Sequence, residues 1–155
     1  MADASPTVQT WLTEFLYNVA GFPQDSLPPT SSLVLTAQRW GYGMVPGEFP
    51  WVFPSPDIYQ LAVNCAAASF LINFAPDVPT AANPTFFNDL RKQYGLFSSQ
   101  VGLLSSTSDE GTSSSYQLSD WTKNANMQDL TWMKDPFGRQ LLGLLQQFGS
   151  LWGLS

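Results

Sequence analysis

Apolar residues recur with the period of an α-helix at the start of the chain. They follow the i, i+3, i+4, i+7 spacing of a helix with one buried face: Val8, Trp11, Leu12, Phe15, Leu16 and Val19. Ser5 can cap this helix, Pro6 can take its first position, and Gly21 follows its end. The pattern predicts a helix from about residue 6 or 7 to Ala20, with the whole apolar stripe in the core.

Three more helices are expected before residue 105. Pro56 to about Phe74 has a long apolar face with several alanines that let another helix approach closely, so it is the expected centre of the fold. Residues 84–104 form the next amphipathic stretch. Residues 31–40 hold a short apolar run that periodicity cannot assign to helix or strand, and we favour a helix that ends at Gly41.

The chain becomes polar after residue 104 and apolar again at its end. Residues 105–115 have no large apolar side chain and cannot bury a face, which predicts a mobile loop or the tip of an extended hairpin. Residues 136–155 open as a helix and keep apolar residues almost to the last position. Because free termini usually fray, this segment either folds back on the chain's own helices or docks on another protein.

These patterns predict a mainly α fold, a helical bundle of about four helices with long loops and an extended C-terminal arm. The expected parts are a helical bundle domain (1–104), a Ser/Thr-rich loop or hairpin (105–135) and a C-terminal docking segment (136–155). A chain of 155 residues with 44% hydrophobic residues suits one domain with appendages.

The missing residue types exclude several kinds of chemistry. The chain has no histidine and one cysteine, Cys65, which excludes Ser–His and Cys–His nucleophilic systems, His-containing zinc sites and an intramolecular disulfide. Cys65 lies among small apolar residues and is expected to be a buried structural thiol. Asp135, before Pro136, is expected in a turn. We therefore expect no enzyme and no cofactor or metal.

Charge is sparse and mostly acidic. Charged residues make up 12% of the chain and the net charge is −6, which disfavours nucleic-acid binding through a basic face. Arg91 and Lys92 form the only basic pair, expected to be a solvated helix face rather than a phosphate contact. A thinly charged surface with 14% aromatic residues indicates area that neighbouring proteins cover.

Two segments supply candidate residues for binding a partner. Between Pro46 and Pro56, aromatic residues alternate with prolines, and the candidates are Phe49, Trp51 and Phe53. This loop either stacks on a sugar, base or peptide or forms a rigid cover or subunit contact, and we favour the second because free aromatics would be adhesive. The C-terminal candidates are Leu141, Leu144, Leu145, Phe148 and Trp152.

The order of these parts resembles a known family across residues 7–104. The residues that carry the resemblance are Trp11, Leu12, Phe15 and Leu16 in the opening helix, the small-residue stretch 59–68, the closure 74–77 and the helix 87–95. Together they resemble the adaptor, or head-completion, proteins of the head-to-tail connector in tailed bacteriophages.

The resemblance implies a helical bundle repeated as a homo-oligomeric ring, commonly a dodecamer, below the portal protein. Its C-terminal arm would reach the portal protein or the tail and nozzle proteins. DNA would pass through the lumen without sequence-specific contact, as an acidic chain allows. The protein would be made in the host cytoplasm and lie at the head–tail junction of the virion, with no membrane contact. The proline-aromatic loop and the serine tract depart from the family pattern, so no family binding residue is transferred to them.

Two alternatives stay open on the sequence. One alternative is a different structural protein of the virion, such as a tail-completion protein. The other is a small glycan- or peptide-binding module built on exposed aromatic residues such as Trp51 and Trp121.

Overall fold

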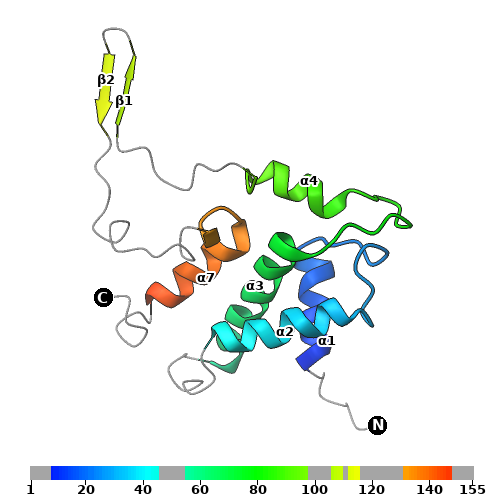
Figure 1. Ribbon diagram of the computed structural model, residues 1–155. Coiled ribbons are helices and arrows are strands. Elements are labelled where there is room, and N and C mark those ends of the chain that lie inside the picture. The colour runs from blue at the N-terminus through cyan, green and yellow to red at the C-terminus, as the bar shows by residue number, and fades with distance from the viewer. Residues whose placement is uncertain (1–7, 46–54, 98–105, 110–111, 116–130, 148–155) are drawn as a thin grey trace, which may run out of the picture.

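The protein is mainly α-helical, as the sequence predicts. The computed structural model describes residues 8–45, 55–97, 106–109, 112–115 and 131–147 (Figure 1). The described elements are α1 (Val8–Glu14), the π-helical segment η1 (Phe15–Val19), α2 (Ser32–Met44), α3 (Pro56–Phe74), α4 (Phe86–Gln93), β1 (Ser106–Asp109), β2 (Thr112–Ser115) and α7 (Pro136–Gln147).

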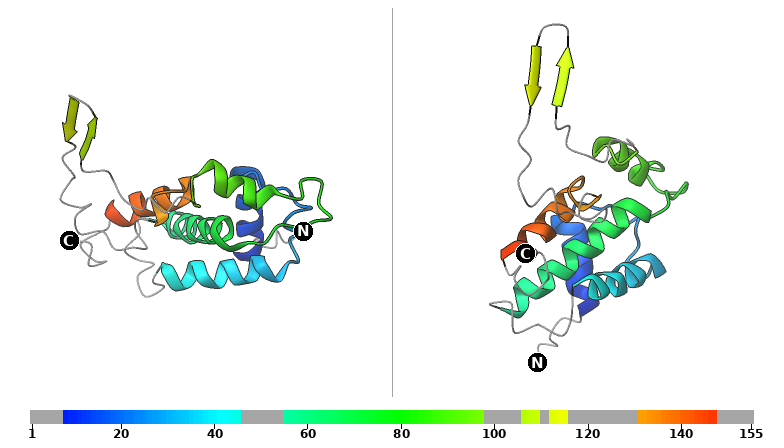
Figure 2. Two further views of the ribbon diagram at one scale, coloured as in Figure 1. Left: turned by 45° about the horizontal axis from the view of Figure 1, so that its top comes forward. Right: turned by 60° about the vertical axis from the view of Figure 1, so that its left-hand side comes forward.

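Helix α3 is the centre of the fold. It packs against α2, α7 and η1 along its length and against α4 near its C-terminal end (Figures 1 and 2). Most of its residues from Gln60 to Ile72 are buried. Its alanines remove bulk where neighbours cross it, so the expectation of a central small-residue helix is confirmed.

The opening helix is only partly as predicted, because its last turn is a π-helix. Leu12, Phe15 and Leu16 are buried, but Trp11 is 36% exposed and Val19 is 67% exposed. The N–H of Ala20 bonds the carbonyl of Phe15, five residues earlier, instead of four. This wider turn rotates the end of the helix relative to an α-helix and takes Val19 off the buried stripe. The expectation that the whole stripe is buried is therefore wrong.

Helix α2 confirms the helical interpretation of the ambiguous run. Ser31 caps it by accepting a hydrogen bond from the N–H of Leu33, and the helix continues through Gly41 to Met44. Gly41 lies tightly against α3, since a Cβ there would lie 2.6 Å from the carbonyl oxygen of Val63. Glycine lets the two backbones come into direct contact at this crossing.

Helix α4 is much shorter than the predicted 84–104. It ends because Gly95 has a φ of 66°, a left-handed conformation that closes the helix. The N–H of Leu96 bonds the carbonyl of Arg91 and the N–H of Gly95 bonds that of Lys92, the hydrogen-bond pattern of a Schellman motif. Residues 98–104 lie outside the described part of the chain.

Helix α7 folds back on the chain's own α3. Leu141, Leu144 and Leu145 are buried in the same core as α3, so they are not free to anchor a partner. Of the two alternatives left open for this segment, folding back on the chain or docking on another protein, the structure has the first for these three candidate leucines. Residues 136–147, which were expected in a separate docking segment, form a helix of the core.

The polar tract contains a hairpin. Strands β1 and β2 pair antiparallel, with Ser106 opposite Ser115 and Asp109 opposite Thr112. Of the two predicted alternatives for 105–115, the structure therefore has the hairpin.

Candidate interaction surfaces

The structure divides the predicted partner-binding residues into two groups. Leu141, Leu144 and Leu145 are in the core. The other candidates lie outside the described residues: Phe49, Trp51, Phe53, Phe148 and Trp152. Two other surfaces, formed by described residues, are the candidates for binding a partner.

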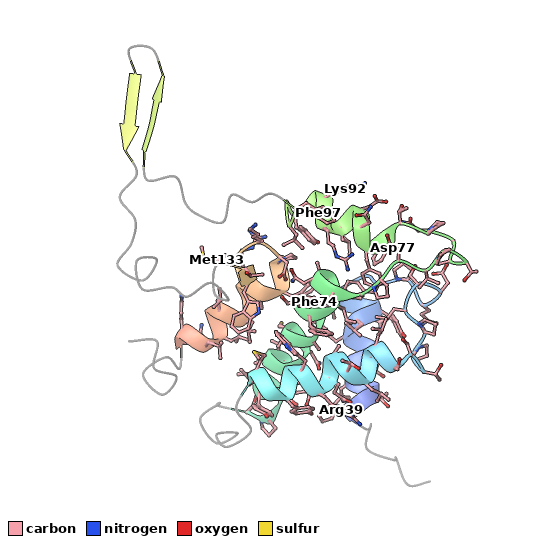
Figure 3. The ribbon with its side chains drawn as sticks, viewed as in Figure 1. Arg39, Phe74, Asp77, Lys92, Phe97 and Met133 are labelled. Atoms are coloured by element: carbon pink, nitrogen blue, oxygen red, sulfur yellow. The ribbon has the colours of Figure 1, made fainter. Side chains whose placement is uncertain are left out.

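The first surface, the aromatic pocket, lies between α2, α3 and the turn before α7. It has a volume of about 270 Å³ and is lined by Trp40, Ser69, Phe70, Asn73, Phe74, Thr131 and Trp132. The ring centroids of Trp40 and Phe70 are 5.2 Å apart, and those of Phe70 and Phe74 are 5.1 Å apart. Phe74 is 66% exposed at the end of α3 (Figure 3). The pocket thus presents a large apolar ring to solvent beside a packed aromatic cluster.

Backbone contacts hold the far wall of the aromatic pocket in place. Trp132 is buried, and its ring meets that of Trp40 edge-on at a centroid distance of 6.4 Å. Gly138 in the first turn of α7 lies so close to the backbone of Trp132 that a Cβ there would overlap it. Trp132 is therefore fixed between α2 and α7.

A buried carboxylate is bonded to one of the residues that line the pocket. Asp135 is fully buried and accepts hydrogen bonds of 2.8 Å from Ser69 Oγ and 2.7 Å from the N–H of Gly138. The second bond caps α7, so the expected turn residue is also a helix cap. Burial raises the pKa of Asp135, and the bonds from Gly138, Ser69 and Asn73 oppose that rise. The cluster ties α7 to α3 through Ser69, which also lines the aromatic pocket.

Cys65 is the buried structural thiol that the sequence predicts. It is almost fully buried on α3. Burial raises the pKa of Cys65 to about 12, and the negative charge of Asp135 adds to the rise. A thiol with this pKa carries almost no thiolate at neutral pH, so it is a poor nucleophile.

The second surface, the α1–α3 groove, is wider and more polar. It has a volume of about 470 Å³ and is lined by Trp11, Glu14, Phe15, Asn18, Val19, Asp57, Gln60, Leu61 and Asn64. The exposed large apolar residues of the opening helix, Trp11 and Val19, form its apolar wall. The π-turn that displaces Val19 from the core thus places it in a surface groove.

Hydrogen bonds fix the floor of the α1–α3 groove. Tyr42 Oη donates to Gln60 Oε1 at 3.0 Å, and Gln60 Nε2 donates to Asn64 Oδ1 at 2.9 Å. Gln60 and Asn64 are one helical turn apart on α3, and both are buried. This chain joins α2 to the groove and satisfies the buried amides, which makes the floor rigid.

The expected solvated face holds for only one residue of the basic pair, Lys92. Arg91 Nε donates to the carbonyl of Ile72 at 2.8 Å, and its guanidinium also donates to the carbonyl of Ala75. Arg91 therefore caps the C-terminus of α3, which corrects the expectation. Lys92 remains exposed and pairs with Asp89 at 3.9 Å.

No protein-family model, no curated protein and no solved structure matches the chain. Within the described ranges, no group of three or more His, Cys, Asp or Glu side chains is placed to hold a metal ion. No helix in that part of the chain is long and apolar enough to cross a membrane.

Sequence reasoning missed both surfaces. The aromatic pocket combines positions 40, 70–74 and 131–132, which only tertiary packing brings together. The one available signal was Phe70 and Phe74, two aromatics spaced by four near the end of an alanine-rich helix. For the α1–α3 groove, the available signal was Trp11, a large aromatic residue at the edge of the apolar stripe of the opening helix.

Proposed function

We propose that the chain is a non-enzymatic structural subunit of a virion, an adaptor ring protein that joins the portal to the tail of a tailed bacteriophage. The observation that carries the proposal is the aromatic pocket. Phe74 is 66% exposed beside a packed cluster of aromatic rings. Contiguous exposed apolar surface of this kind marks contacts with other proteins.

The anatomy of the pocket supports a protein partner. Its rings are held by helix packing and by the Ser69–Asp135 bond, so little side-chain entropy is lost on binding. Rigid aromatic anchors of this type dominate the energy of protein interfaces. A volume of about 270 Å³ is just below the ~300–1,000 Å³ of small-molecule sites, and it suits one side chain of a partner.

The charge of the chain supports a role beside DNA without binding it. A net charge of −6 repels the duplex, so a ring of such subunits lets DNA pass through its lumen. Partners on this proposal are further copies of the chain, the portal protein and the tail or nozzle proteins.

Imaging of the particle of origin tests the proposal. We expect density for this chain as a ring between portal and tail at the head–tail junction. The variant Phe74→Ser is expected to stay folded, because Phe74 is exposed, but to be lost from particles. Phe97→Ser is the matched control, since Phe97 is 62% exposed and does not line the pocket. Density elsewhere in the particle, or equal incorporation of both variants, contradicts the proposal.

The same pocket favours one second candidate, a small glycan- or peptide-binding module. The partly exposed Trp40 and the exposed Phe74 line it, and sugars stack on such rings. Tryptophan fluorescence titrated with a glycan and peptide panel separates the two functions. Saturable quenching that Phe74→Ser abolishes would favour the binding module over the structural subunit.

A further inference from the structure

The α1–α3 groove carries two exposed carboxylates beside an apolar wall. Glu14 and Asp57 line it from α1 and α3, and neither forms an ion pair with another described residue. Trp11 and Val19 supply the wall, with 36% and 67% exposure. An apolar wall with two free carboxylates fits a helix that presents an apolar side chain and a cation on one face.

Helix α2 presents such a face. Leu35 is 41% exposed, and Arg39 follows four residues later, so both lie on the same side of the helix. Arg39 has no ion pair among the described residues. We call Leu35 and Arg39 the α2 ridge. Figure 3 shows Arg39 on α2, well apart from Phe74.

We propose that the α2 ridge of one copy docks into the α1–α3 groove of a second copy. Leu35 then packs on Trp11 and Val19, and Arg39 pairs with Glu14 and Asp57. The inference rests on the proposed function, because it describes how copies of the subunit join. An arginine held between two carboxylates and beside an indole ring gains both charge pairing and cation–π contact.

Charge complementarity selects α2 rather than α7 as the helix that docks. Arg139 on α7 is the other exposed cation outside an ion pair in the described ranges. The exposed residues near it are Gln140 and Gly143, which offer no apolar side chain to the groove wall. Among the cations of the described ranges, Arg39 alone combines a charge outside any ion pair with an exposed apolar neighbour one turn away.

The ridge and the groove permit assembly beyond a dimer. None of the residues that line the groove belongs to α2. A copy whose groove is occupied therefore keeps its own ridge free for the next copy. Such head-to-tail contacts close into rings when the rotation between copies allows it, and otherwise extend as filaments.

Charge reversal tests the contact on the full chain. Arg39→Glu alone, and Glu14→Arg with Asp57→Arg, should each weaken self-association by about tenfold or more, as measured by sedimentation velocity. Mixing the two variants should restore assembly, because each reversed surface then meets its complement. Arg139→Glu changes the net charge by the same amount as Arg39→Glu and should leave assembly unchanged. Circular dichroism verifies the fold, which these exposed positions should not affect.

The outcomes separate this inference from the proposed function. If the chain self-associates but Arg39→Glu behaves like Arg139→Glu, the ridge–groove contact is wrong and the structural subunit stands. If the unmodified chain stays monomeric at all concentrations, self-assembly fails, and the inference fails with it.

A photo-crosslinker at position 19 identifies what fills the groove. Cross-links to residues 32–44 of a second, isotope-labelled copy are expected. Cross-links to residues 148–155 of the same chain, or to another protein only, would overturn the inference by assigning the groove to a different occupant.

Discussion

Ser69 Oγ donates a 2.8 Å hydrogen bond to Asp135 Oδ2, and both side chains are buried. The bond joins the middle of α3 to the start of α7, two positions separated by 66 residues. Asp135 also caps α7 through the N–H of Gly138. One carboxylate thus fixes both the start of a helix and its docking on the core, next to Ser69 of the aromatic pocket.

Stability should depend on the protonation of Asp135. Burial raises its pKa above the ordinary value of 3.8, so the folded chain holds the proton more tightly than the unfolded chain. Its contribution to stability is therefore fully present below pH 3.8 and is lost as pH rises through the folded pKa. Asp135→Asn keeps an acceptor for the cap and removes this titration. In urea unfolding at several pH values, the free energy of unfolding of the unmodified chain, minus that of Asp135→Asn, should fall as pH rises.

A pH-independent difference between these two chains would show that Asp135 titrates alike in the folded and unfolded states. Ser69→Ala provides a second measurement. Losing this hydrogen bond to the ionised carboxylate should raise the folded pKa of Asp135 further, so the free energy of unfolding should fall by a larger amount as pH rises.

The α2–α3 crossing should tolerate no side chain at Gly41. Gly41→Ala places a methyl group against the carbonyl of Val63 and should cost about 1–3 kcal/mol of unfolding free energy. Gly43→Ala, on the open side of the same helix, should instead stabilise the chain by up to about 1 kcal/mol. Thermal unfolding followed by circular dichroism compares the pair, and equal effects would contradict the close crossing.

Asp77, in the loop after α3, caps α4, and Arg91 of α4 caps α3, so each cap should be measurable. Asp77 Oδ1 accepts from the N–H groups of Phe87 and Asn88 at the start of α4, while Arg91 caps α3. Asp77→Ala should cost about 1 kcal/mol, and Asp77→Asn much less, because the amide oxygen still accepts. Chemical unfolding of the two variants tests this; a loss as large for Asn as for Ala would show that charge, not the cap, matters.

The apolar face of α7 should stabilise the chain whether or not a partner is present. Leu141→Ala should cost about 2–5 kcal/mol, because Leu141 is fully buried, whereas Gln140→Ala on the exposed side should have little effect. Ending the chain after Pro136 should lower the helical circular dichroism by more than the deleted residues account for. If the remaining helices kept their full signal, α7 would be an accessory to the core and not part of it.

Much of the helical fold was predictable because it depends on local pattern. The stripe of the opening helix, the alanines of α3 and the apolar period of α7 each indicate a helix without knowledge of its neighbours. The end of α4 also has a local signal, because Gly95 follows a turn that contains basic residues. The apolar period beyond Gly95 nevertheless predicted a longer helix. The hairpin was one of two alternatives that a polar tract leaves open.

The candidate surfaces were not predictable, since they depend on which faces meet. Local pattern alone placed Trp11 and Val19 in the core and left Leu141 free to be a core residue or a docking anchor. The amino-acid sequence by itself determined that this protein is a helical bundle, poor in charge and without histidine chemistry. Only the tertiary structure decided that α7 covers α3, that a π-turn moves Val19 outward, and that Asp135 lies buried against Ser69 of α3. The physical reason is that a helix period fixes which residues share a face, whereas the choice between core and surface for that face is made by the elements that pack on it.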